Sequence, residues 1–239
     1  MLKEFNIFEG MLNNLDRRGV RIINTINPHS YCQSKKDIKF KEALLNSDVL
    51  LPDGTGIVLA TKILTGKKIN KIAGADIHQH LLEKAHATKQ KVFYLGASKQ
   101  TLRLIEARIK KEFSNIIVGS YSPSYKTEFS NQDTNAMVCA VNDFMPDYLF
   151  VGMTAPKQEK WVDANKDKIH AKIITSIGAV FDFYAGTIQR SSPFWINIGL
   201  EWLPRLLKEP KRLWKRNFIS TPLFLLDLLK AKIVKLLKL

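Results

Sequence analysis

Six short apolar segments, separated by longer amphipathic stretches, constrain most strongly how this chain can fold. The segments run over residues 21–26, 48–54, 91–97, 115–121, 147–153 and 172–178. Segments that are apolar almost throughout are typical of strands in a parallel sheet whose two faces are both covered. Each segment is therefore predicted to be a strand buried between two layers of helices.

The stretches between these segments have the hydrophobic spacing of amphipathic helices. Helices are expected over residues 30–46, 56–65, 75–89, 99–113, 131–144 and 156–168. Regular alternation of strands with helices is typical of an α/β fold with right-handed crossovers. The sequence therefore predicts a Rossmann-like core, with a parallel sheet and helices on both of its faces.

The positive charge of the chain is concentrated near its C-terminal end. The whole chain has a formal net charge of +15, and residues 190–239 carry +8 of it, together with three of the four tryptophans. Basic residues interleaved with Trp, Leu and Phe indicate a surface that meets something both anionic and apolar. We therefore divide the chain into a Rossmann-like core, residues 1–192, and a basic amphipathic helical appendage, residues 193–239.

The last part of the appendage has a broad apolar stripe at helical spacing, bordered by lysines. The stripe consists of Leu223, Leu226, Leu229, Ile233, Leu236 and Leu237. It fits an anionic membrane surface, and it fits equally a tail that packs on the core or on a second subunit. No segment reaches the ~20 apolar residues of a membrane-spanning helix. We expect peripheral membrane attachment, and we expect the core to fold without residues 219–239.

Polar clusters follow several of the predicted strands, at the edge of the sheet where ligands bind in folds of this kind. Thr25 and Asn27 follow the first strand, Asp53 lies in the PDGTG sequence after the second, and Gln158 and Glu159 follow the fifth. Asp53 is placed to bind a hydroxyl group or to accept a proton, although a turn or a helix cap would also explain it. The clusters together predict one cleft.

Several common ligand motifs are missing from the sequence. It has neither GxGxxG nor GxxxxGK[ST], which disfavours a dinucleotide or P-loop site. HExxH, CxxC and DxD are also absent, and the HQH sequence puts His78 and His80 on different faces of a helix, so no metal site is predicted. An enzyme that handles a diphosphate without a metal needs Lys or Arg to balance its charge.

The polar clusters, in their order along the chain, resemble the WecG/TagA/CpsF family of bacterial glycosyltransferases. The similar stretches are TINPHS, DVLLPDGTGIVLA, IAGADI, VFYLGAS, PDYLFVGMTAPKQEKW, IGAVFDFYAGTIQRSSPFW and GLEWLPRLLKEPKRLWKR, between residues 21 and 216. The combination of PDGxG, PxQE and EWxxRLxxEPxR is far more specific than any of these motifs alone.

The resemblance implies a hexosyltransferase that uses a UDP-sugar, often UDP-N-acetylmannosamine, as donor. It implies a polyprenyl-diphosphate-linked sugar as acceptor, at the cytoplasmic face of the cell membrane. The products of such enzymes enter teichoic acid, common antigen, capsule or exopolysaccharide. The resemblance further implies inversion at the anomeric carbon and a reaction that needs neither a metal nor another cofactor.

The resemblance also assigns roles to individual residues. Asp53 falls on the position of the catalytic base, which enclosure would have to make more basic than a free Asp. The residues that fall on substrate-binding positions, or in the motifs that contain them, are Thr25, Asn27, Lys71, Gln158, Glu159, Arg205 and Arg212. Lys71 stands where the family usually has Arg, which keeps the charge but loses the bidentate fork.

A basic nucleic-acid-binding protein is the alternative hypothesis, because a basic tail can grip phosphates. The Leu and Trp content of the tail argues against it, and we expect no nucleic-acid partner. The expected partners are a UDP-sugar, a lipid-linked acceptor and an anionic membrane surface. A homo-oligomer is compatible with the sequence.

Overall fold

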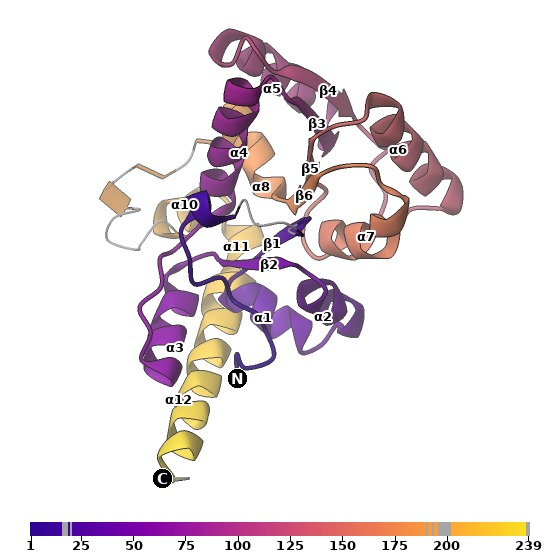
Figure 1. Ribbon diagram of the computed structural model, residues 1–239. Helices are drawn as coiled ribbons and strands as arrows, with labels where there is room; N and C mark the ends of the chain where they lie inside the picture. Colours follow the sequence, from indigo (N-terminus) through magenta and orange to yellow (C-terminus); the bar gives the residue numbers. More distant parts are fainter. Residues whose placement is uncertain (16–18, 20, 190, 193, 196–201, 238–239) are drawn as a thin grey trace.

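A six-stranded sheet with only parallel pairings forms the centre of the protein (Figure 1). The computed structural model describes residues 1–15, 19, 21–189, 191–192, 194–195 and 202–237. The strands are β1 (Ile22–Ile26), β2 (Val49–Pro52), β3 (Lys91–Gly96), β4 (Ile117–Tyr121), β5 (Tyr148–Gly152) and β6 (Ile173–Ser176). All six lie within the segments predicted from the sequence, and the expected parallel sheet is confirmed.

The strands are arranged in the order β2-β1-β6-β5-β3-β4. The chain therefore builds one half of the sheet with β1 and β2, moves across to β3 and β4, and fills the middle with β5 and β6. Because all strands are parallel, their carboxyl ends lie at one edge of the sheet. The loops that carry the predicted site residues leave the sheet at this edge.

Helices cover both faces of the sheet (Figure 1). The helices of the core are α1 (Pro28–Ser34), α2 (Ile38–Leu45), α3 (Thr55–Thr65), α4 (Gly74–Thr88), α5 (Lys99–Glu112), α6 (Asn131–Phe144), α7 (Lys157–Asn165) and α8 (Gly178–Ala185). Alternate residues of a strand point to opposite faces. In β3, Val92 and Tyr94 pack with α4, α5 and α8, whereas Phe93 and Leu95 pack with α6 and α7. This two-sided burial explains why the strands are apolar throughout.

Two helical predictions need correction. The helix expected over residues 30–46 is divided into α1 and α2, because Asp37 accepts a hydrogen bond from the backbone N–H of Phe40 and caps a new helix there. Helix α8, which is eight residues long and begins one residue beyond the end of β6, is not among the helices predicted from the sequence. Its GAVFDFYA sequence is apolar on most sides, so the periodicity did not distinguish it from a continuing strand.

The appendage is helical, as predicted, in the residues that the structure describes. It contains α10 (Trp202–Lys208), α11 (Pro210–Trp214), a π-helical segment η3 (Lys215–Ser220) and α12 (Thr221–Leu237). Pro210 occupies the first turn of α11 and separates it from α10, in line with the geometry of a proline that cannot continue a helix. The domain boundary at residues 192 and 193 stays a prediction.

One face of α12 packs against the core. Phe224 and Leu228 are buried in a cluster with residues of α1, α2 and α3, and the Phe224 ring meets the Tyr31 ring edge-on at 5.4 Å. Asp227 lies beside this contact, where Lys35 Nζ donates to its Oδ2 at 2.6 Å and the Tyr31 hydroxyl donates to the same atom at 3.3 Å. The appendage is thus attached to α1 by both apolar and charged contacts.

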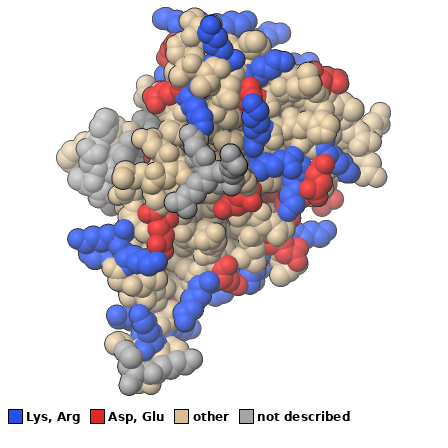
Figure 2. All heavy atoms as spheres, viewed as in Figure 1, with Lys and Arg blue, Asp and Glu red and all other residues tan. Residues whose placement is uncertain are grey.

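The opposite face of α12 is exposed, and it contains the stripe that the sequence predicts. The exposed residues include Leu223, Leu226, Leu229, Ile233, Leu236 and Leu237, which are 43–81% exposed. In Figure 2 blue Lys and Arg side chains gather around the lower end of the molecule, where α12 ends. The structure therefore separates the core-packing positions of this helix from an apolar outer face.

The buried face of α12 can be tested with Phe224→Ala. Removing this fully buried ring leaves a cavity between α12 and α1, and we expect a loss of about 3 kcal/mol in the free energy of unfolding. Leu226→Ala is the matched control, because this leucine of the same helix is 52% exposed and its truncation should cost under ~0.5 kcal/mol. Urea denaturation measures both values. Equal losses would contradict the packing described for α12.

Candidate active site

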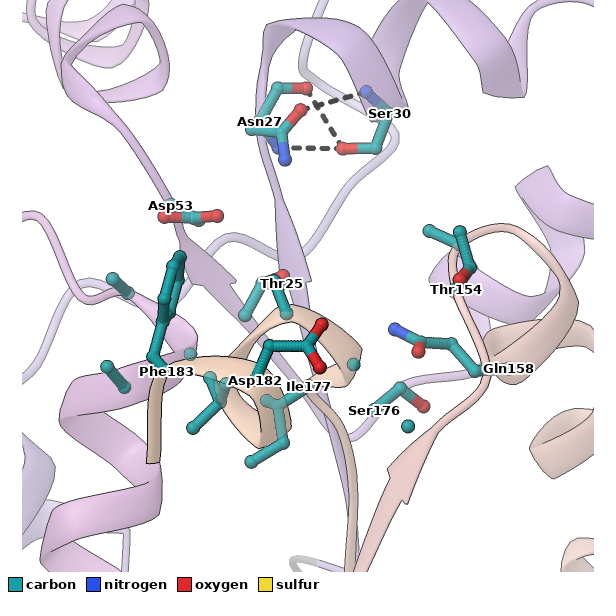
Figure 3. Close-up of a pocket in the computed structure, with 18 of the residues that line it drawn as sticks. Thr25, Asn27, Ser30, Asp53, Thr154, Gln158, Ser176, Ile177, Asp182 and Phe183 are labelled. Carbon is teal, nitrogen blue, oxygen red and sulfur yellow. Dashed lines mark hydrogen bonds between the residues drawn. The ribbon is translucent and has the colours of Figure 1, made fainter. Parts of the chain in front are cut away.

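A cavity of about 610 Å³ opens at the carboxyl edge of the sheet (Figure 3). Five of the predicted site residues line it: Thr25, Asn27, Asp53, Gln158 and Glu159. They come from three separate segments: the end of β1, the residue after β2, and the first turn of α7 after β5. The structure thus brings together residues more than a hundred positions apart, as the strand order requires.

Three other predicted residues are not placed at the cavity. Lys71 precedes α4 and is not among the described residues that line it, although Ala73 and Gly74 are. Arg205 and Arg212 belong to α10 and α11, and their side chains lie outside the described part of the structure. The roles assigned to these three residues stay predictions.

Asp53 directly follows β2, and its position is fixed by the sheet. Its backbone N–H donates to the carbonyl of Ile26 at the end of β1, at 2.8 Å. The next residue, Gly54, has a φ of +100°, a conformation that residues with a side chain rarely adopt. The chain turns there into α3, so the half-buried Asp53 carboxylate is left in the cavity wall (Figure 3).

Asn27 has a structural role that limits what it can offer a ligand. Its Oδ1 accepts the backbone N–H groups of His29 and Ser30, each at 3.0 Å, and so caps α1. Ser30 Oγ in turn accepts the backbone N–H of Asn27 at 2.7 Å. Because Oδ1 is committed to the cap, the Nδ2 amino group is the part of this side chain that can act on a ligand.

The cavity contains polar residues that sequence reasoning did not single out. Ser176 ends β6, Asp182 projects from α8 into the cavity, and Arg216 reaches it from the π-helical segment η3 (Figure 3 shows the first two). Asp182 lies in α8, after the sixth strand, and Arg216 lies in the basic appendage. Arg216 differs from its basic neighbours only because η3 docks against α1, and no local sequence motif predicts that docking.

The appendage contacts the cavity rim through His29. Its Nδ1 lies 2.8 Å from Ser220 Oγ, and Cys32 Sγ contacts the carbonyl of Ser220 at 3.3 Å. Burial, together with the nearby Arg216 guanidinium, holds the pKa of His29 below its usual value. At neutral pH this imidazole is therefore uncharged, and Arg216 supplies positive charge at the rim.

Two residues of the cavity wall have an unusual backbone conformation. Ala97 after β3 has a φ of +57°, and Thr154 after β5 has a φ of +72°. A positive φ costs energy for residues other than glycine and is often found at functional sites. The two other non-glycine residues with this conformation in the described part, Lys89 and Met145, simply end helices.

Comparison with known proteins identifies the family of this chain. The model of the Glycosyl transferase WecG/TagA/CpsF family matches residues 3–237, nearly the whole chain. The chain belongs to this family. This confirms the resemblance drawn from the motifs, and it identifies the protein as a glycosyltransferase rather than the nucleic-acid-binding protein of the alternative hypothesis.

The family members that the chain resembles include several with one name. An N-acetylglucosaminyldiphosphoundecaprenol N-acetyl-beta-D-mannosaminyltransferase of Bacillus subtilis (strain 168) is 30% identical over 91% of this chain and 82% of its own length. Proteins with the same name from Bacillus spizizenii and from Staphylococcus aureus (strain MW2) are 30% and 27% identical, over 90% and 88% of this chain and 81% and 80% of their own lengths.

The described residues that line the cavity contain no group of side chains that could hold a metal ion. Across the described part of the chain, no three His, Cys, Asp or Glu side chains gather in a way that could hold an ion. In the same residues, no helix is long and apolar enough to cross a membrane.

The wall formed by the PxQE motif contains a buried acid. Glu159 is only 4% exposed, and burial raises its pKa to about 7. A hydrogen bond from Gln158 lowers the pKa in part, but it does not offset the loss of hydration. In the unfolded chain this carboxyl would ionise near its ordinary pKa of ~4.3. Folding therefore becomes less favourable as the pH rises from about 4 to 7.

The penalty for burying Glu159 can be measured with Glu159→Gln. Below pH 4 the carboxyl is protonated in both states, so the variant and the wild type should unfold at similar temperatures. At pH 8 the wild type bears the full penalty, and we expect the variant to be more stable by up to ~3 kcal/mol. Thermal unfolding at both pH values checks this. The prediction would be wrong if the stability of the variant relative to that of the wild type fell between pH 4 and pH 8.

Proposed function

We propose that this protein transfers N-acetylmannosamine from a UDP-linked donor to N-acetylglucosamine that is joined through a diphosphate to a polyprenol. The names of the Bacillus and Staphylococcus relatives support this assignment, at 27–30% identity over most of the chain. The cavity supports it as well, because about 610 Å³ is within the range of pockets that hold small-molecule ligands. The product would enter a cell-surface polysaccharide such as teichoic acid.

In this proposal Asp53 is the general base. The acceptor hydroxyl is a weak nucleophile, and a carboxylate that takes its proton as it attacks the anomeric carbon lowers the barrier. A single direct attack of this kind inverts the configuration at that carbon. The support for Asp53 is its place in the cavity wall, in the PDGTG motif, within reach of a ligand held between β1 and β5.

The leaving UDP carries growing negative charge, and the proposal assigns its stabilisation to basic side chains. Arg216 is the described cation that lines the cavity, and Arg205 and Arg212 remain proposed partners from the same appendage. A fixed positive charge at a site that excludes water stabilises such a leaving group strongly. With these groups present we propose that no metal cofactor is required.

The base assignment predicts that Asp53→Asn nearly abolishes transfer. The amide keeps the shape of the side chain but takes no proton, so the rate should fall by ~10²–10⁴-fold while the fold is retained. Product formation from UDP-N-acetylmannosamine and a short-chain lipid-linked acceptor measures the loss. If the purified variant kept more than about a tenth of the wild-type rate, Asp53 would be a turn residue and not the base.

We further propose that the exposed face of α12 rests on the anionic inner surface of the cell membrane, where the lipid-linked acceptor lies. The face is apolar along its length, and Lys230 and Lys232 border it. Apolar side chains that enter the acyl boundary and lysines near anionic lipid both favour this attachment. The protein would then be peripheral, with the cavity held near the headgroups.

The membrane proposal predicts that the double variant Leu226→Glu, Leu229→Glu loses at least tenfold in its partition onto anionic vesicles. Both leucines are more than half exposed, so the change removes apolar surface and adds repulsive charge without touching the packed face. Leu104→Glu is the control, because this leucine is 42% exposed on α5, away from α12. Vesicle co-sedimentation distinguishes them. Equal retention of the double variant and the control would show that this face does not bind the membrane.

A further inference from the structure

Glu159 has a hydrogen-bonding pattern that suits a neutral acid. Its Oε1 accepts a hydrogen bond from Gln158 Nε2 at 2.9 Å. Its Oε2 is buried and has no hydrogen-bond partner within the described part of the structure. Ser176 Oγ, which belongs to the same cavity lining, is also buried without a partner there. A buried carboxylate normally needs several hydrogen bonds or a cation, so this environment favours the protonated form.

The ion pairs formed by charged residues of α7 and its neighbours do not include Glu159. Lys160 pairs with Asp37, the N-cap of α2, at 2.8 Å, and Lys166 pairs with Asp163 at 2.8 Å. Strands β5 and β6, on which α7 packs, contain no charged residue. The titratable or charged residues that share the cavity lining with Glu159 are His29, Asp53, Asp182 and Arg216.

The amide of Gln158 is held in one orientation. Its Oε1 accepts the backbone N–H of Met153 at 3.2 Å, and its Nε2 donates to Glu159. Gly178 lies directly against this amide, because a Cβ added to Gly178 would come within 2.6 Å of Gln158 Oε1. The second N–H of Nε2 is then the group that Gln158 can offer to a ligand, and Figure 3 shows the nitrogen end of the amide directed into the cavity.

We propose that neutral Glu159 is a positioning residue that holds Gln158 as a hydrogen-bond donor to the sugar nucleotide. The inference rests on the proposed function, which supplies the anionic ligand, and it goes further by fixing the protonation state that the site needs. Glu159 then does not contact the substrate itself, in contrast to the substrate-binding role that the sequence predicts for it.

The protonation state matters because the ligand is a diphosphate. An ionised Glu159 would put an unpaired negative charge in the wall of the cavity that holds this ligand, in a region of low dielectric where repulsion is strong. The neutral acid accepts the same hydrogen bond from Gln158 without that repulsion. Binding of the sugar nucleotide should therefore be favoured by protonation of Glu159 and weakened when it ionises.

The test measures binding of UDP-N-acetylmannosamine by titration calorimetry at pH 6 and pH 8, without acceptor. The diphosphate of this ligand is a diester and does not titrate in this range. With a pKa of about 7, Glu159 is protonated in most of the wild-type protein at pH 6 and in about a tenth of it at pH 8. Because only the protonated form is expected to bind well, the apparent dissociation constant of the wild type should rise about tenfold between these pH values. Glu159→Gln, which is neutral at both pH values, should bind like the wild type at pH 6 and keep that affinity at pH 8.

Two control variants complete the experiment. Glu128→Gln removes an exposed carboxylate that does not line the cavity, and it should retain the pH dependence of the wild type. Gln158→Leu removes the donor and should weaken binding at pH 6 by at least tenfold. If this variant binds UDP alone with an equal loss of affinity, the hydrogen bond from Gln158 goes to the diphosphate or the nucleoside. If its affinity for UDP is unchanged, the hydrogen bond goes to the sugar.

The outcomes separate this inference from the proposed function. Two results would overturn the role of Glu159 and leave the proposed function standing. One is the same pH dependence of binding in the wild type and Glu159→Gln, and the other is tenfold weaker binding by a folded Glu159→Gln at pH 6. Unchanged binding by a folded Gln158→Leu would overturn it as well. Failure of the wild type to bind any of a panel of UDP-sugars would contradict the proposed function together with this inference.

Discussion

The common direction of the six strands is the constraint on which the rest of this structure depends. A parallel sheet needs a crossover between consecutive strands, and these crossovers bury both faces and leave all carboxyl ends at one edge. Loops from β1, β2, β5 and β6 therefore meet around one cavity. Asp53 and Gln158 line the same cavity because of the order of the strands, which does not require any direct interaction between their two segments.

Docking of the appendage is the second determinant of the site. Phe224 and Leu228 attach α12 to α1, and the contact between His29 and Ser220 fixes the π-helical segment just before it. This places Arg216 at the cavity. The same helix has its apolar outer face turned away from the core. One element thus connects the proposed membrane surface to the cation that the proposed chemistry needs.

Most of the fold could be predicted from the sequence because its signals are local. Two-sided burial makes each strand apolar, which predicts all six strands, and the PDGTG and PxQE motifs point to Asp53, Gln158 and Glu159, which line the cavity. What was missed depends on tertiary contacts. The position of Arg216 at the cavity depends on the docking of η3, and the raised pKa of Glu159 depends on its burial. The short helix α8 was missed because its apolar sequence has no clear period.

The substrate-binding role that the motif assigns to Lys71 stays a prediction. The resemblance assigns it to the substrate, yet the described cavity lining includes Ala73 and Gly74 but not Lys71. The motif places Lys71 just before α4, and the direction of its long side chain depends on tertiary packing that the motif does not encode.

The measurement that tests the central claim most directly is analysis of the reaction product. Purified protein is incubated with UDP-N-acetylmannosamine and a lipid-diphosphate-linked N-acetylglucosamine, and the lipid product is examined by mass spectrometry and by NMR of the anomeric proton. The account predicts one added N-acetylhexosamine in the inverted configuration, with one UDP released per product. No transfer to this acceptor, or a product with retained configuration, would contradict a direct displacement assisted by Asp53.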